Sequence, residues 1–180
     1  NMKASRKTVT LQAPLHSQED GGIDRLVALV VEDTPHMAGI ICGILKSTGV
    51  TRIHQARTGA DALHILANYP VHVAIIDDLE PPLDGLAVIR EVRTASARLP
   101  NALPVILVTT KAEKSAVFAA RDAGATEVLS KPFSAAQLIT RVKSVLKKPR
   151  PFIKSEEFAG PDRRRRTKPV DEKKRNADLQ

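Results

Sequence analysis

Five short segments with strand character, each followed by a stretch with helical periodicity, constrain the fold of this chain more than any other feature. The segments that we expect to be strands occupy residues 25–31, 51–57, 71–77, 103–110 and 126–133, and the first, third and fourth of them contain continuous apolar runs. The segments that we expect to be helices occupy residues 36–49, 58–70, 85–97, 111–125 and 134–148. Because parallel strands need crossover connections, this alternation predicts an α/β fold: a five-stranded parallel sheet with helices on both faces.

The carboxyl ends of the predicted strands carry an unusual set of polar side chains. In open parallel sheets, ligands bind outside these ends, so the residues that follow each strand are candidates for a site. They are Glu32, Asp33, Asp77, Asp78, Thr109, Thr110 and Lys131. The sequence therefore brings several carboxylates, hydroxyls and an amine to one edge of the sheet.

Adjacent carboxylates at the end of a buried strand need compensation. Like charges repel each other, and a partly buried carboxylate loses hydration. Carboxylate oxygens are good ligands for Mg²⁺, and Lys131 supplies a fixed positive charge. The alternative is an acidic cluster that only solvates the sheet edge, which would leave the cost of its burial uncompensated. We therefore expect a site for a metal ion and an oxyanion.

The spacing of these residues resembles the receiver domain of bacterial response regulators, which has the flavodoxin-like, CheY-like fold. The resemblance covers residues 25–147 and rests on four elements that occur in order. They are an acidic pair after the first strand, D-x-x-x-P-x-x-D-G after the third, a Ser/Thr after the fourth and K-P-F after the fifth. Asp77 fits the second element better than Asp78, because Pro81 and Gly85 lie four and eight residues after Asp77.

By this resemblance Asp77 is the phosphoacceptor. It would take a phosphoryl group from a phosphohistidine of a sensor histidine kinase or a phosphotransfer protein. The protein would then be a switch in a two-component or chemotaxis-type pathway, and not a turnover enzyme. Attack by a carboxylate requires an ionised acid and shielding of the incoming negative charge.

The resemblance also implies which groups surround the phosphoryl group and the metal ion, Mg²⁺. The implied direct ligands of Mg²⁺ are Asp33, Asp77 and the main-chain carbonyl of Leu79. Glu32 would act on the ion through water. Lys131 would pair with one phosphoryl oxygen, and the hydroxyl of Thr109 would bond to another.

Three positions depart from the pattern of the family. Glu80 precedes the proline where methionine is frequent, and Thr110 follows Thr109 where a smaller residue is common. Val128 stands in the fifth strand where many receivers have the Tyr or Phe that turns inward on activation. We therefore expect any conformational change to proceed through Thr109 and the loop after it.

The positive charge is concentrated at the C-terminal end. The net charge is +8, and residues 147–180 carry twelve Lys/Arg and six Asp/Glu, whereas residues 25–146 carry thirteen and eleven. We expect three parts: a flexible arm over residues 1–24, a receiver domain over 25–147, and a basic tail rich in Pro and Arg over 148–180.

The same composition bears on the cellular compartment. No apolar run approaches the roughly 20 residues that span a bilayer, so we expect no membrane span. The single cysteine, Cys42, excludes an internal disulfide and any multi-cysteine metal site. These features predict a cytoplasmic protein.

The tail combines exposed charge with apolar residues that are costly to expose. Phe152, Ile153 and Phe158 would dock on the domain or on a partner, whereas we expect the last dozen residues to be disordered. A Gly-Pro turn then precedes four consecutive arginines, Arg163, Arg164, Arg165 and Arg166. The tail is too short to be a winged-helix or similar output domain, so we do not expect specific DNA binding.

Two functional hypotheses follow, and they are not exclusive. In the first, the phosphorylated protein signals by contact with an output protein, for which the flagellar motor is one candidate. In the second, the protein is a nucleotide-sensing adaptor that uses the receiver as a docking platform. Its tail resembles the arginine-rich extensions of a subgroup of CheY-like proteins, which implies cyclic di-GMP or another phosphate ligand. Nonspecific nucleic-acid binding is disfavoured, because aromatic residues make up only 3% of the chain.

Overall fold

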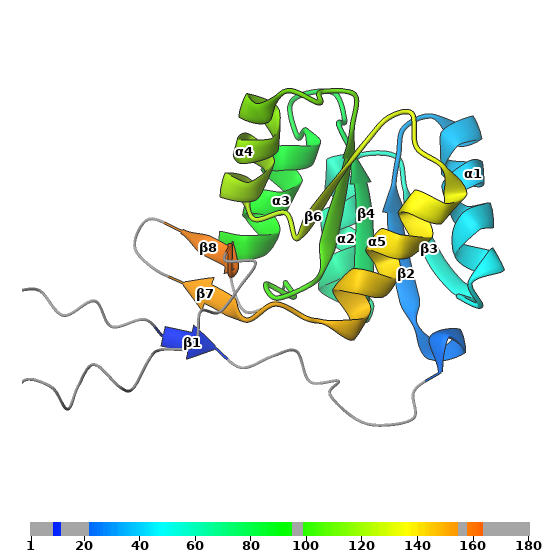
Figure 1. The fold of residues 1–180 in the computed structure, drawn as a ribbon, viewed down its shortest axis with the longest axis horizontal. Coiled ribbons are helices and arrows are strands. Elements are labelled where there is room, and N and C mark those ends of the chain that lie inside the picture. The colour runs from blue at the N-terminus through cyan, green and yellow to red at the C-terminus, as the bar shows by residue number, and fades with distance from the viewer. Residues whose placement is uncertain (1–8, 12–21, 95–98, 155–157, 164–180) are drawn as a thin grey trace, which may run out of the picture.

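The computed structural model describes residues 9–11, 22–94, 99–154 and 158–163, and a five-stranded parallel sheet lies at its centre (Figure 1). The strands of this sheet are β2 (Val27–Val31), β3 (Arg52–Ala56), β4 (Val73–Asp77), β5 (Val105–Thr109) and β6 (Glu127–Ser130). The helices are α1 (Pro35–Ser47), α2 (Gly59–Asn68), α3 (Gly85–Thr94), α4 (Lys114–Ala123) and α5 (Ala135–Lys147), with a short 3₁₀ turn, η1 (Ile23–Arg25), before β2. The predicted fold is confirmed, with element bounds that differ from the expected ones by a few residues.

The strand order β3-β2-β4-β5-β6 creates a switch point in the middle of the sheet. The chain first adds β3 on one side of β2, and then adds β4, β5 and β6 in turn on the other side. Strands β2 and β4 pair directly, from Ala28↔Val73 to Val31↔Ile76. Open α/β sheets bind ligands at the carboxyl ends of the strands on either side of such a point, so the topology places a site where β2 and β4 end.

Two apolar clusters cover the two faces of the sheet. Successive strand residues point to opposite faces, so Leu29 belongs to the cluster under α2, α3 and α4, and Val30 belongs to the cluster under α1 and α5. All five residues of β2 are buried, which explains why the strand reads as a continuous apolar run. In α1, Ile41 and Leu45 belong to this second cluster, whereas Ile40 is 42% exposed.

Local signals in the sequence fix where several helices begin and end. Ser134 forms a capping box with Gln137 at the start of α5, and Gly124 ends α4 in the left-handed conformation at φ 104°. Thr34 precedes α1, but its hydroxyl donates to the Asp33 carboxylate at 3.2 Å and does not cap the helix. Within the described ranges, no helix has both the length and the apolar character to cross a membrane.

A second, antiparallel sheet joins the two ends of the chain. Its strands are β1 (Val9–Leu11), β7 (Phe152–Lys154) and β8 (Ala159–Pro161), in the order β1-β7-β8. The segment predicted as a flexible arm, residues 1–24, contains a strand, with Val9 opposite Lys154. Three-residue strands so far apart carry no periodic signal, and only the pairing of the backbones reveals them.

The tail docks beside the parallel sheet, at the ends of α3 and α4 (Figure 1). Phe152 is only 2% exposed, so one of its three apolar residues is buried within this chain and needs no partner to cover it. Close approach is possible because two glycines meet: a Cβ on Gly160 would lie 3.1 Å from the Cα of Gly124. Two further contacts hold the next segment: Arg163 pairs with Asp122 at 3.0 Å, and its guanidinium lies 3.8 Å from the ring centroid of Phe158.

A buried arginine lies beneath this docked tail. Arg93 of α3 is 2% exposed and donates to two main-chain carbonyls, those of Gly124 at 3.0 Å and Asn101 at 2.6 Å. Its Nη2 has no hydrogen-bond partner among the described residues. Burial lowers the pKa of Arg93 to about 10. The side chain therefore links α3, the end of α4 and the loop before β5.

We expect Phe152→Ala to destabilise the protein, because the substitution leaves a cavity where the tail docks. The expected loss in the free energy of unfolding is about 3 kcal/mol, the size typical of a buried Phe→Ala change. Urea unfolding followed by circular dichroism measures it. Phe118→Ala is the matched control, since Phe118 is 58% exposed and its removal should cost under about 0.5 kcal/mol. Equal stability of the two variants would contradict the docked position of β7.

Candidate functional site

Three carboxylates converge where β2 and β4 end. Oxygen atoms of Glu32, Asp33 and Asp77 lie within 4.8 Å of one another. Glu32 is buried, Asp33 is exposed and Asp77 is partly buried, so the cluster runs from the sheet to the surface. The parallel pairing of β2 with β4 produces this arrangement, because it aligns the residues that follow Val31 with the end of β4.

Lys131 provides the positive charge of the cluster. Its Nζ lies 2.7 Å from Oδ1 of Asp77 and 3.3 Å from Oε2 of Glu32. The position follows from the register of the sheet: Ser130 is opposite Thr109, and the amide of Lys131 donates to the Thr109 carbonyl at 2.8 Å. The structure thus brings together the lysine and the acids that the sequence placed at this edge.

The electrostatics of the cluster reflect its partial burial. Burial raises the pKa of Glu32, and the nearby charge of Asp77 raises it further, although the amide of Thr34 stabilises the carboxylate from 3.0 Å. Burial alone would lower the pKa of Lys131, but the hydrogen bond and charge of Asp77, with those of Glu32, outweigh this effect and raise it. The three carboxylates form a set of hard oxygen ligands that suits a divalent cation such as Mg²⁺.

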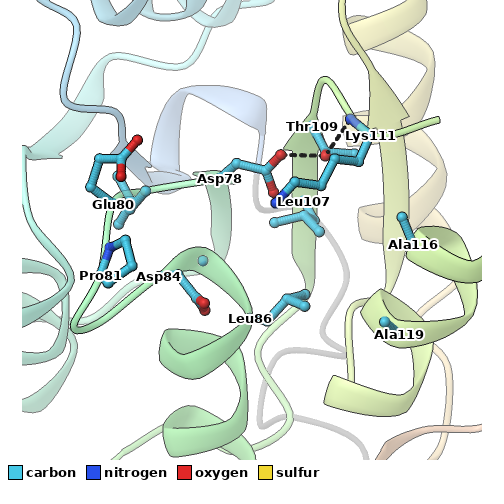
Figure 2. A pocket seen from close by; sticks show the side chains of 12 residues that line it. Asp78, Glu80, Pro81, Asp84, Leu86, Leu107, Thr109, Lys111, Ala116 and Ala119 are labelled. Atoms are coloured by element: carbon cyan, nitrogen blue, oxygen red, sulfur yellow. Dashed lines mark hydrogen bonds between the residues drawn. The ribbon is translucent and has the colours of Figure 1, made fainter. Parts of the chain in front are cut away.

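Thr109 lies beside this cluster, and its hydroxyl both donates and accepts a hydrogen bond. The residue is 2% exposed, and its Oγ1 donates to Oδ2 of Asp78 and accepts from the amide of Lys111 at 2.9 Å. Figure 2 shows both bonds within a pocket of about 310 Å³ that Glu80 and Asp84 also line. Asp78, which fits the phosphoacceptor motif less well than Asp77, is thus a hydrogen-bond partner of Thr109.

The remaining predicted positions are placed as follows. The side chain of Leu79 is buried, and Glu80 and Thr110 are exposed. Val128, which replaces an aromatic residue, is partly buried and packs against the cluster under α2, α3 and α4. Asp84 belongs to the turn before α3, and its carboxylate accepts from the amide of Ala87 at 2.8 Å.

The structure does not bring Arg163 to this edge. It pairs with Asp122 near the end of α4, whereas Ala116, near the start of this helix, lines the pocket beside Thr109. The ten residues of α4 separate its two ends by about 15 Å. The other predicted arginines, Arg164, Arg165 and Arg166, lie outside the described residues.

Comparison with known proteins identifies the family. The model of the response regulator receiver domain matches residues 28–143, which is more than half of the chain. The chain belongs to this family. It is 31% identical over 123 residues to the response regulator MprA of Mycobacterium sp. (strain KMS), and the match covers 68% of this chain and 51% of that protein. The chain therefore spans about half the length of the curated relatives that it matches.

Solved structures agree with this assignment. The receiver is similar to the chemotaxis protein CheY4 of Vibrio cholerae, at 25% identity and a TM-score of 0.61, covering 67% of this chain and 98% of that one. It is also similar to the receiver domain of a sensor histidine kinase from Pseudomonas aeruginosa PAO1, at 26% identity and a TM-score of 0.61, covering 68% and 98% of the chains. That second structure holds a magnesium ion in its active-site cleft.

Membership of the family settles the class of chemistry. Receiver domains accept a phosphoryl group, are not turnover enzymes, and have sensor histidine kinases as partners. They coordinate Mg²⁺ at an acidic active site, and an acidic cluster of this kind is present here. The resemblance drawn from the sequence is thus confirmed at the level of the family and the fold.

We expect Mg²⁺ to stabilise this receiver through the acidic cluster. Binding to the folded state alone should raise the free energy of unfolding by about 2.7 kcal/mol at a free Mg²⁺ concentration one hundred times its Kd. Thermal unfolding in a series of MgCl₂ concentrations measures the gain. Asp33→Asn should remove most of it, whereas Glu91→Gln, at an exposed position on α3, should retain it. A gain that survives in Asp33→Asn would exclude this carboxylate from the metal site.

Proposed function

We propose that this protein is a response regulator whose Asp77 accepts a phosphoryl group from the phosphohistidine of a sensor kinase or phosphotransfer protein, in a reaction that depends on Mg²⁺. The observation that carries the proposal is the contact of Lys131 with Asp77 at 2.7 Å inside a cluster of carboxylates. A lysine in that position offsets the negative charge of the carboxylates and can pair with an incoming anion.

The residues have separate roles in the proposed reaction. One oxygen of Asp77 forms a bond to phosphorus while the bond from phosphorus to the imidazole nitrogen breaks, and the imidazole leaves with the electron pair. Lys131 pairs with a phosphoryl oxygen, and the hydroxyl of Thr109 donates to another. The residues that would hold Mg²⁺ are Asp33, Asp77 and the main-chain carbonyl of Leu79, with Glu32 acting through water. Bound there, the ion supplies positive charge that offsets the repulsion between two anions.

We further propose how the protein transmits its signal. The receiver, over residues 25–147, would act by contact with an output protein, for which the flagellar motor remains a candidate, in the cytoplasm. Residues 1–24 and 148–180 would be an arm and a basic tail added to it. Because Val128 offers no aromatic ring to turn inward, the change would proceed through Thr109 and the loop that follows β5.

We expect incubation with acetyl phosphate and Mg²⁺ to add one phosphoryl group to the protein, seen by intact-mass spectrometry. Asp77→Asn should show no addition, because the substitution removes the attacking oxygen. Glu80→Gln is the matched control in the same turn and should still be labelled. Labelling of Asp77→Asn, or none of the wild type with Mg²⁺ present, would refute the proposal.

A second candidate function concerns the tail. The ion pair and the stacking contact of Arg163 hold the start of the arginine run against α4. Arginines bind phosphates through paired hydrogen bonds and stack on bases. We therefore keep the proposal of a nucleotide-sensing adaptor, in which Arg163, Arg164, Arg165 and Arg166 bind cyclic di-GMP or another phosphate ligand.

Replacing all four arginines with alanine should abolish cyclic di-GMP binding, measured by isothermal titration calorimetry, and leave labelling at Asp77 intact. The loss is expected because alanine can neither pair with a phosphate nor stack on a base. Lysine at the same four positions keeps the charge, and should restore little affinity if paired hydrogen bonds are what matter. Unchanged affinity in the alanine variant would remove the tail from the site.

A further inference from the structure

We propose that Asp78 is a positioning residue that holds the hydroxyl of Thr109 in the unphosphorylated protein, so that phosphorylation must exchange this bond for one to the phosphoryl group. The inference rests on the proposed function of Asp77 and extends it to a residue that the pattern of the family does not assign. It stands on the hydrogen bond from Thr109 Oγ1 to Asp78 Oδ2, which Figure 2 shows.

The exchange follows from the number of donors. A threonine hydroxyl has one hydrogen to donate. In the structure this hydrogen goes to Asp78, while the amide of Lys111 donates to the same oxygen at 2.9 Å. Phosphoryl oxygens only accept hydrogen bonds, so Thr109 cannot bond to a phosphoryl group and to Asp78 with the same hydrogen. The two bonds are therefore mutually exclusive.

The surroundings make the bond to Asp78 a strong competitor. Thr109 is 2% exposed, so its hydroxyl has little access to water as an alternative partner. Asp78 is half-buried, and a hydrogen bond to an ionised acceptor is stronger than one between neutral groups. In the unphosphorylated state the Thr109 hydroxyl thus already donates its hydrogen to Asp78, whereas the phosphorylated state needs that hydrogen for a phosphoryl oxygen.

Glu80 is a control position that distinguishes the effect of the Thr109–Asp78 hydrogen bond from the effect of a nearby negative charge. It lines the same pocket and carries the same charge, but it is exposed, and the hydroxyl of Thr109 bonds to Asp78 and not to it. If Asp78 acted only by repelling an incoming anion, removal of either carboxylate would have a similar effect. If Asp78 acts through Thr109, only the removal of Asp78 should change the affinity for a phosphoryl group, and only in a protein that retains the Thr109 hydroxyl.

Beryllium fluoride with Mg²⁺, a stable mimic of the phosphoryl group on an aspartate, provides the test. The chain has no tryptophan to report binding, so titration calorimetry measures the affinity. Asp78→Ala should bind the mimic roughly tenfold more tightly than the wild type, because the hydroxyl no longer has to leave a charged acceptor. Glu80→Ala should change the affinity less than about twofold.

A double-mutant cycle with Thr109→Val identifies the route of the effect. In the Thr109→Val background, the tenfold gain from Asp78→Ala should disappear, since there is no hydroxyl to release. Asp78→Asn keeps an acceptor of the same shape and should lie between the wild type and Asp78→Ala. An equal gain with and without the Thr109 hydroxyl would overturn the proposal and leave charge as the cause.

A measurement on the protein without any phosphoryl mimic tests the role of Asp78 separately from the proposed phosphorylation of Asp77. The amide of Lys111 bonds to the Thr109 hydroxyl, so its signal in a ¹H–¹⁵N spectrum reports on that oxygen. The signal should move in Asp78→Ala and not in Glu80→Ala. A signal unmoved by Asp78→Ala would refute the role of Asp78, whereas failure of the wild type to bind the mimic would refute the proposed function itself.

Discussion

The ion pair between Lys131 and Asp77 is the interaction on which the site depends. Without a cation, three carboxylates at the end of two buried strands would repel one another in a partly dehydrated setting. Lys131 contacts both Asp77 and the buried Glu32, and so allows β2 and β4 to end on acids at the middle of the sheet. One ion pair therefore links the fold to the chemistry: Asp77 ends β4, and Lys131 directly follows β6.

The parallel sheet and most of the acidic site could be predicted from the sequence, because both follow from local hydrophobic patterns and from the topology of parallel sheets. A run of buried β-branched residues can only be a covered parallel strand here, and parallel strands present their carboxyl ends at one edge. These rules predict from the sequence that Glu32, Asp33, Asp77 and Lys131 lie at one edge of the sheet. They do not predict the hydrogen-bond partner of Thr109, because a hydrogen bond between neighbouring loops depends on side-chain rotamers and not on spacing in the sequence.

Other features could not be predicted for different physical reasons. The sheet of β1, β7 and β8 pairs three-residue segments from opposite ends of the chain, which have no periodicity to detect. Arg93 reads as a solvated residue of an amphipathic helix, yet it is 2% exposed and two main-chain carbonyls accept its hydrogens. Burial of a charge in this way depends on a tertiary contact about which the local sequence is silent.

The placement of α4 has a mechanical consequence. Near its start, Ala116 and Ala119 form a wall of the pocket beside Thr109, and near its end Asp122 is tethered to Arg163 of the tail. A helix of this length behaves as a stiff rod, so a tilt that withdraws one end displaces the other. A partner that binds the tail and displaces it would therefore also displace the α4 residues that line the phosphorylation pocket. The two ends of α4 thus couple the tail to that pocket.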